Sequence, residues 1–157
     1  MLYSKPCEYA IRALVCIARN PAGAASGDSI ARAGNVPKPV LGKVLQDLVR
    51  KGLLASRRGP GGGFQLARRA DLITLRDIVA AVDGLDHFLR CSAGLPQCSD
   101  DSPCPVHDQW KPIRTHLMHF FETTTLDRMA ETVIRKEKKL TRSKQSARAW
   151  RVSWGER

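Results

Sequence analysis

The sequence lacks the features of a membrane protein or a secreted protein. No apolar run approaches about eighteen residues, the length of a membrane-crossing helix, so no transmembrane segment is expected. The apolar stretch near the N-terminus is broken by Glu8 and Arg12, and no cleavage-like site follows it, so no signal peptide is expected. We therefore expect a cytoplasmic protein. Thiols stay reduced in that compartment, so the five cysteines indicate metal or redox chemistry more than disulfides.

The sequence also lacks the common fingerprints of enzymes. The glycines at 59 and 61–63 are not followed by Gly-Lys-Ser or Gly-Lys-Thr, and no helix opens after them, which argues against a phosphate-binding P-loop. No C-x-x-C pair or cofactor fingerprint is present, so a thiol redox enzyme is the least favoured alternative. We expect a protein that is not an enzyme.

Acidic residues are few, and the basic excess is unevenly distributed. The chain has 26 Lys and Arg against 15 Asp and Glu, a formal net charge of +11. Residues 1–66 carry ten basic against three acidic side chains, and residues 135–157 carry nine against two. The middle of the chain, residues 67–134, is slightly acidic, with seven basic against ten acidic side chains. Positive charge clustered in this way favours a polyanionic partner, most often a nucleic acid.

Three of the cysteines lie in a stretch that has little apolar surface to order it. Cys91, Cys98 and Cys104 are spaced C-x6-C-x5-C, and His107 follows three places after the last. The residues between them are mainly Gly, Pro, Ser and Asp, which favour turns. The spacing is wider than in common zinc modules or bacterial ferredoxins, and a wider loop can wrap a larger group. An iron–sulfur cluster is therefore favoured over three ordinary thiols on a mobile loop.

The N-terminal part of the chain predicts a helix-turn-helix motif. Apolar periodicity indicates helices over residues 5–19 and 29–33, and a third helix that begins near Pro39. Gly34 and Asn35, which tolerate left-handed conformations, separate the second helix from the third. The third helix has a regular apolar stripe on one face, so its other face can enter a major groove.

A glycine-rich turn follows the third helix and predicts a β-hairpin wing. Residues 53–56 and 64–66 can form strands on either side of it. Arg57 and Arg58 at its base suit phosphate contact or insertion into a narrow minor groove. The candidate DNA-contacting residues are Ser4, Lys5, Ser29, Lys38, Pro39, Val40, Lys43, Gln46, Arg57, Arg58, Gly59, Pro60 and Gly61.

The C-terminal half predicts three further helices and a basic tail. The first spans residues 71–82, with Thr74 as a possible capping residue, and a longer one begins at Trp110, which places Pro112 in its first turn. The last begins at about Leu126. Apolar residues of the long helix predict a dimer interface, with packing on their own domain as the alternative: Ile113, Leu117, Phe120 and Phe121.

These features predict a mainly α-helical fold with a small β-wing, in which a winged helix-turn-helix domain is followed by a long dimerisation helix. We assign residues 1–84 to the DNA-binding domain and 85–109 to a cysteine-rich cluster-binding loop. Residues 110–138 form the dimerisation helices. The basic tail, 139–157, lacks a sustained apolar face and is expected to be disordered or to fold on binding.

The chain resembles the winged-helix transcription regulators typified by IscR and NsrR. The resemblance covers residues 1 to about 135 and is carried by Glu8-Tyr9-Ala10-Ile11-Arg12-Ala13-Leu14, Val36-Pro37, Arg58-Gly59-Pro60-Gly61-Gly62-Gly63-Phe64, Ile78-Val79-Ala80-Ala81-Val82-Asp83-Gly84, the cysteine loop and Thr125-Leu126. It implies a homodimer that binds a palindromic DNA operator. It also implies a transcriptional repressor that senses redox state, nitric oxide or iron status through an iron–sulfur cluster.

The resemblance implies that Cys91, Cys98 and Cys104 ligate a [2Fe–2S] or [4Fe–4S] cluster, with a structural zinc as the alternative. IscR-like members take a fourth ligand from a histidine three places after the last cysteine, here His107. NsrR-like members take it from an acidic residue of the partner subunit, here Glu8. The first cysteine gap is six residues, one more than in IscR, so Glu8 is preferred.

The third helix departs from the family in a way that bears on DNA recognition. Val40 stands where many relatives have an aromatic residue, and Gly42 offers no side chain to a base. Direct base readout is therefore expected to be thin.

Overall fold

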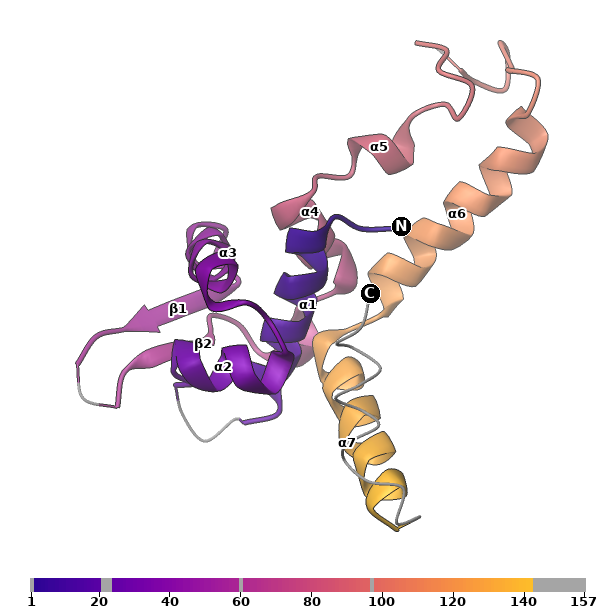
Figure 1. The fold of residues 1–157 in the computed structure, drawn as a ribbon. Helices are drawn as coiled ribbons and strands as arrows, with labels where there is room; N and C mark the ends of the chain where they lie inside the picture. The colour runs from indigo at the N-terminus through magenta and orange to yellow at the C-terminus, as the bar shows by residue number, and fades with distance from the viewer. Residues whose placement is uncertain (1, 21–23, 60, 97, 143–157) are drawn as a thin grey trace.

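The structure is a computed structural model that describes residues 2–20, 24–59, 61–96 and 98–142. It is mainly helical, with a winged-helix body from which α6 and α7 run out in opposite directions (Figure 1). The elements in order are α1 (Lys5–Ala18), α2 (Gly27–Gly34), α3 (Lys38–Arg50), β1 (Leu54–Arg57), β2 (Gly63–Leu66), the 3-10 helix η1 (Ala70–Leu72), α4 (Leu75–Val82), α5 (Asp86–Leu89), α6 (His107–Thr123) and α7 (Leu126–Arg142). None of the helices in these described ranges has the length and apolar character needed to cross a membrane.

The predicted helix-turn-helix is confirmed, with helix ends close to those expected. The side chain of Ser26 caps α2 by accepting a hydrogen bond from the backbone N–H of Ser29. Asn35 ends α2 in the left-handed conformation, with φ of 48°. This single residue turns the chain from α2 into α3, and Pro39 lies in the first turn of α3.

The predicted wing is confirmed as an antiparallel hairpin that points away from the body (Figure 1). Leu54 pairs with Leu66 at its base and Arg57 with Gly63 near its tip. Ala25 extends the sheet by exchanging two backbone hydrogen bonds of 2.9 Å with Phe64. A Cβ atom at Gly63 would lie 2.4 Å from the carbonyl oxygen of Ala25, so no larger residue fits at this crossing.

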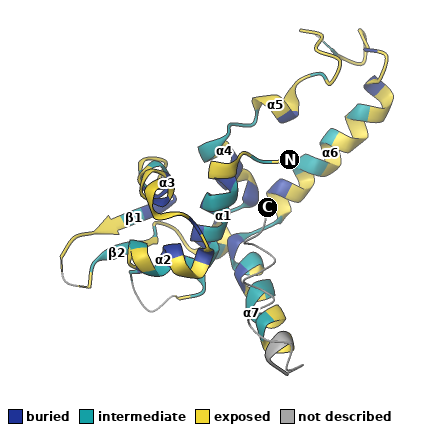
Figure 2. Cartoon of the chain, in the orientation of Figure 1, coloured by how far each residue is buried: buried dark blue, intermediate teal, exposed yellow. Residues whose placement is uncertain are grey.

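Two apolar clusters hold the body together, and the buried residues gather where the helices meet (Figure 2). The larger cluster lies among α1, α2, α3 and the base of the wing, and includes Leu14, Ile30, Leu45 and Leu48. The smaller cluster joins the N-terminal half of α1 to α4, α5 and α6. Its buried members are Cys7, Leu75, Val79, Phe88 and Phe121.

A short backbone bridge fixes the C-terminal helices to the body. The N–H of Leu75 donates to the carbonyl of Thr124, and the N–H of Leu126 donates to the carbonyl of Ile73, both at 2.8 Å. Thr74 also caps α4 in a reciprocal capping box with Asp77, as its sequence position suggested. The turn from α6 into α7 is therefore attached to the start of α4.

The structure corrects four details of the sequence-based expectations. The predicted helix over 71–82 is a short 3-10 turn followed by α4. The helix is interrupted because Ile73 has an extended backbone, and its carbonyl accepts a hydrogen bond from the N–H of Leu126. The long helix begins at His107, three residues before Trp110, so Pro112 lies inside α6 and not in its first turn. Helix α7 extends to Arg142, so the start of the predicted tail is helical. The rest of that tail, from 143, lies outside the described residues.

The fourth correction concerns the predicted dimer interface. Phe121 is fully buried in its own chain, where its ring packs edge-on against Phe88 with centroids 5.1 Å apart. Leu117 is half-buried beside it. Ile113 and Phe120 are 55% and 46% exposed, so these two residues remain available to a partner. The alternative of packing on the own domain is right for Phe121, because it lies on the inner side of α6.

Replacing Phe121 with Ala should destabilise the fold by about 3–5 kcal/mol, because it leaves a cavity in the smaller cluster. Phe120→Ala is the matched control, since the adjacent side chain is half exposed. Urea unfolding of both variants would measure the difference. Equal losses of unfolding free energy would contradict the placement of Phe121 in the core.

Candidate metal centre and nucleic-acid interface

The three cysteines of the loop converge in space. The sulfur atoms of Cys91, Cys98 and Cys104 all lie within 4.8 Å of one another. Cys104 is buried, and the other two are partly exposed. The loop lies at the outer end of α6, far from the wing (Figure 1). The three thiols thus form one centre within the segment 85–109 that the sequence predicted as a cluster-binding loop, and this segment also contains α5 and the first three residues of α6.

His107, the first residue of α6, lies beside one of the three cysteines. Its Nδ1 lies 3.1 Å from the sulfur of Cys98, and the residue is 7% exposed. Hydrogen bonding from His107 lowers the pKa of the Cys98 thiol to about 7. Hydrogen bonds with Cys98 and Asp100 raise the pKa of His107. Burial raises the pKa of Cys104, so Cys98 ionises more readily than Cys104.

Asp100 and Lys111 hold His107 from its other side, and the sequence did not single them out. Asp100 accepts from Nε2 of His107 at 2.9 Å, and the ammonium of Lys111 contacts both carboxylate oxygens at 2.6 Å. Lys111 lowers the pKa of Asp100 and keeps it ionised. A carboxylate on the far nitrogen of a ligating histidine fixes its tautomer and orientation. An aspartate between the second and third cysteines was the signal available in the sequence.

The first turns of α6 also anchor the start of the cysteine loop. The indole N–H of Trp110 donates to the carbonyl of Arg90 at 3.2 Å. The guanidinium of Arg114 donates to the carbonyl of Leu89 at 3.1 Å. These two bonds hold the residues just before Cys91 against α6. The helix therefore positions both ends of the loop, since His107 lies at its N-terminus.

Glu8, the other candidate ligand, lies elsewhere in this chain. It is on α1, where its carboxylate is 2.9 Å from the ammonium of Lys5 and 3.9 Å from the guanidinium of Arg12. Helix α1 and the cysteine loop are well separated in the chain (Figure 1). Only Glu8 of a second subunit could reach the cysteines, and that role stays a prediction.

The donor set fits a thiolate-bound metal centre. Three thiols and one imidazole are the ligand types that zinc and iron–sulfur clusters take in proteins. Thiolates on one tetrahedral zinc ion lie about 3.8 Å apart, as follows from a Zn–S bond of about 2.3 Å. The three sulfur atoms lie within 4.8 Å of one another, so the loop gathers its thiols at one place where a single metal group could be bound.

The DNA-binding candidates on α3 form an exposed face. Pro39, Val40, Lys43 and Gln46 are all exposed, and nothing lies within 4 Å of a Cβ placed on Gly42. Val40 offers a small apolar side chain and Gln46 an amide that can pair with adenine. This face can enter a groove closely, but it has few groups that distinguish bases.

The wing supplies the basic groups beside α3. Arg57, Arg58, Gly59 and Gly61 are exposed, and no ion pair neutralises either arginine within the described ranges. Pro60 lies outside the described residues.

The remaining DNA-binding candidates are engaged in structural contacts. The hydroxyl of Ser4 caps α1 and contacts Asp83, and Lys5 pairs with Glu8. The ammonium of Lys38 is 2.8 Å from Asp28, and the hydroxyl of Ser29 donates to the carbonyl of Ser26.

Comparison with known proteins agrees with this fold. A family model described as "Rrf2: Iron-dependent Transcriptional regulator" matches residues 3–132. A putative HTH-type transcriptional regulator of Aquifex aeolicus is 34% identical over 128 residues, covering 80% of this chain and 89% of the relative. The HTH-type transcriptional regulator IscR of Pectobacterium atrosepticum is 28% identical over 123 residues, which cover 78% of this chain and 74% of that relative.

The solved structure of CymR, the global cysteine regulator of B. subtilis, has a similar fold. Its TM-score is 0.70 at 25% sequence identity, covering 84% of this chain and 98% of CymR. The expected winged-helix fold class is therefore confirmed.

Changing Arg57 and Arg58 together to Ala should weaken DNA binding and flatten its salt dependence. Each lost phosphate contact should reduce the slope of log K against log salt by roughly 0.9, so by about 2 for each wing. The matched control is Arg69→Ala with Arg76→Ala, because these arginines are already paired with Asp71 and Glu122. Equilibrium binding measured from about 50 to 200 mM salt tests this. A slope unchanged in the wing variant rules out wing contact with phosphates.

Proposed function

Because this chain belongs to the Rrf2 family of transcriptional regulators, we propose that it regulates transcription in response to an iron–sulfur cluster held by its cysteine loop. Family membership identifies a DNA-binding transcriptional regulator and not an enzyme, as the sequence predicted. We further propose that it binds a palindromic operator as a homodimer, and that it acts as a repressor.

One observation carries the cluster proposal: three thiols converge in a loop with almost no apolar core, and an imidazole contacts one of them. The sulfur atoms lie within 4.8 Å of one another although the first and last cysteines are separated by twelve residues. In a reduced thiol state, such convergence brings ionisable groups together at a cost in repulsion and desolvation. A bound metal group would remove that cost and order the loop. Cys91, Cys98 and Cys104 would be its thiolate ligands.

We infer that His107 supplies the fourth protein ligand. Its ring is already against Cys98, and Asp100 and Lys111 orient it from behind, as in sites where a carboxylate positions a ligating histidine. The sequence alone favoured Glu8 because of the altered cysteine gap. In this chain Glu8 is paired with Lys5 and Arg12, and a ligand role would require it to leave them.

The helix α6 supports a link between the metal centre and the DNA-binding domain. An iron–sulfur cluster supplies sensitivity to oxidation, nitric oxide or iron supply when bound. His107 would hold the N-terminus of α6 to the loop, and Trp110 and Arg114 hold the same helix to the end of α5. The other end of α6 is attached to α4 at Thr124. Loss of the loop's order would therefore release one end of a helix whose other end rests on the winged domain.

The exposed side of α6 supports the proposed homodimer. Ile113 and Phe120 lie two helical turns apart on the same face, and both are exposed. A symmetric partner would bury them against its own α6 or winged domain. Two winged domains related by a twofold axis would present two α3 helices to half-sites about one helical turn of DNA apart, or a multiple of that.

A structural zinc site is the second candidate, because three cysteines and one histidine form a common closed zinc site. The three thiols of the loop lie within 4.8 Å of one another, and His107 contacts Cys98. In that case the protein binds DNA without sensing through the loop. Anaerobic purification followed by absorption spectroscopy and iron, sulfide and zinc analysis separates the two candidates. Visible absorption with stoichiometric iron and sulfide supports the cluster, whereas colourless protein with one zinc per chain supports the second candidate.

His107→Ala should shift the visible absorption of the cluster and shorten its lifetime in air, because it removes the proposed fourth ligand. Glu8→Ala is the direct comparison and should change neither. Absorption spectra of both variants, purified without oxygen and then exposed to air, measure the effect. Bleaching by Glu8→Ala alone would assign the fourth ligand to the partner subunit.

Ile113→Asp should convert the dimer to monomers and abolish tight operator binding, because it places a carboxylate in an apolar interface. Thr115→Asp adds the same charge to an exposed position on another face of α6 and should leave the dimer intact. Sedimentation velocity at several protein concentrations gives the oligomeric state. A dimeric Ile113→Asp variant would exclude this face of α6 as the interface.

A further inference from the structure

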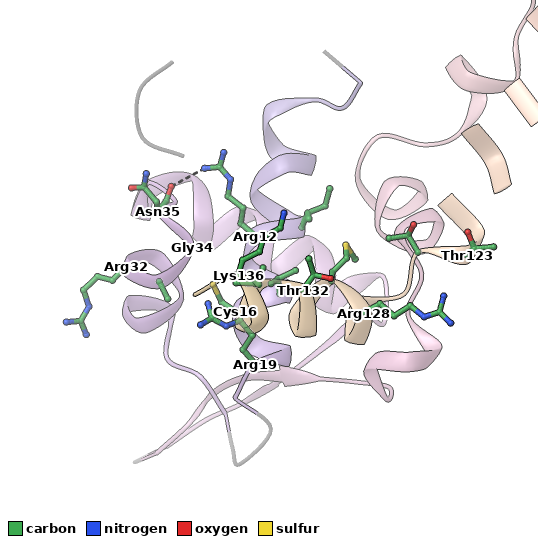
Figure 3. A pocket seen from close by; sticks show the side chains of 16 residues that line it. Arg12, Cys16, Arg19, Arg32, Gly34, Asn35, Thr123, Arg128, Thr132 and Lys136 are labelled. Carbon is green, nitrogen blue, oxygen red and sulfur yellow. Dashed lines mark hydrogen bonds between the residues drawn. The ribbon is translucent and has the colours of Figure 1, made fainter. Parts of the chain in front are cut away.

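A cavity between the winged domain and α7 is not explained by DNA binding or by the metal centre. It has a volume of about 560 Å³ and lies between α1, the end of α2 and α7 (Figure 3). Volumes of about 300–1,000 Å³ are usual for sites that bind small molecules. The metal centre lies at the opposite end of α6, so the cavity is a separate feature (Figure 1).

The walls of the cavity are mainly apolar. Helix α1 contributes Ile11 and Val15, and α7 contributes Met129 and Val133, all of which are partly exposed. Met129, Val133 and Lys136 recur at helical spacing, so one face of α7 lines the cavity along two turns. A ligand with an apolar body would cover side chains that are otherwise left half-exposed to water.

The charges at the cavity are all of one sign. Arg12 comes from α1 and Lys136 from α7, and both line the cavity; in Figure 3 the guanidinium of Arg12 is directed toward Asn35, whereas Arg32 points away from the cavity. The side chain of Arg12 is only 14% exposed, its guanidinium lies 3.9 Å from the carboxylate of Glu8, and it donates to the carbonyl of Asn35 at 3.5 Å, so a ligand carboxylate would add to these contacts. Arg19 also lines the cavity, and its guanidinium pairs with the carboxylate of Glu137. Among the described residues that line the cavity there is no Asp or Glu.

We propose that this cavity binds a small amphipathic anion, with an apolar body between α1 and α7 and a carboxylate or similar group at Arg12 and Lys136. Charge complementarity separates this occupant from the other possibilities. A second copy of the chain has a net charge of +11, and the chain's own segment after residue 142 is also basic, so both would bring positive charge to a cationic opening. A DNA backbone is anionic but has no apolar body to fill the walls.

Such a ligand would connect two parts of the fold. Its apolar body would contact α1 of the winged domain and α7 together, and Thr123 and Thr124 at the end of α6 also line the cavity. Binding would therefore hold α7 more firmly on the body. The free energy of that contact is expected to appear as greater thermal stability in the presence of ligand.

Decanoate, used below its micelle-forming concentration, is a suitable probe for the full-length protein. Calorimetric titration should show saturable binding of about one decanoate per chain and a rise in melting temperature. Decanol and decylammonium have the same apolar body without the negative charge, and both should bind at least about tenfold more weakly. Equal binding of the three probes would overturn the assignment of an anion site.

Variants in α7 test the location of the site. Lys136→Ala should weaken decanoate binding by about tenfold, and Val133→Trp should abolish it by filling the cavity. Lys139→Ala is the matched control, because it removes the same charge from an exposed position of α7 that does not line this cavity. Circular dichroism would show that each variant is folded. No saturable binding to the unsubstituted chain, as expected if a second copy or the C-terminal segment covers the cavity, would overturn the proposal. Equal losses of decanoate affinity in Lys136→Ala and Lys139→Ala would also overturn it.

Discussion

The arrangement of this protein depends on a backbone bridge of two hydrogen bonds. The strand-like pairing of Thr74 with Thr125 attaches the turn between α6 and α7 to the start of α4. Backbone bonds of this kind fix direction, so α6 and α7 leave the winged domain on opposite sides. Helix α6 has 17 residues, which corresponds to roughly 25 Å, and it carries the cysteine loop that far from the bridge. This backbone bridge thus determines where the cysteine loop and the cavity lie relative to the wing.

The two ends of α6 differ in what stabilises them. At the bridge, Phe121 and its neighbours bury an apolar cluster, so that end is held by packing. At the outer end, polar contacts of His107, Trp110 and Arg114 replace a core. The contact of His107 with Cys98 depends on the state of that thiol, whereas a packed apolar core does not. The outer end is therefore the part of the molecule best suited to respond to a bound metal group.

The predicted DNA-binding surface consists of exposed side chains of α3 and the wing, whereas the cysteine loop gathers its side chains around one point. The exposed face of α3 is small and weakly charged, and the wing supplies arginines without partners among the described residues. Affinity is then expected to come largely from phosphates, and sequence preference from close groove fit and from DNA shape. In the proposed homodimer, such an interface would depend on the spacing between two winged domains more than on individual base contacts. Small changes at α6 would then alter that spacing.

The fold class, the family resemblance, the wing and the three-cysteine loop could all be predicted from the sequence, because they depend on local patterns: apolar periodicity, turn-forming glycines and cysteine spacing. Comparison with known proteins confirms the family resemblance. The buried position of Phe121, the support of His107 by Asp100 and Lys111, and the cavity beside α7 are decided by tertiary structure alone. Each depends on which residues distant in sequence meet. The bridge between Thr74 and Thr125 decides those meetings, since its partners are fifty-one residues apart and no local pattern connects them.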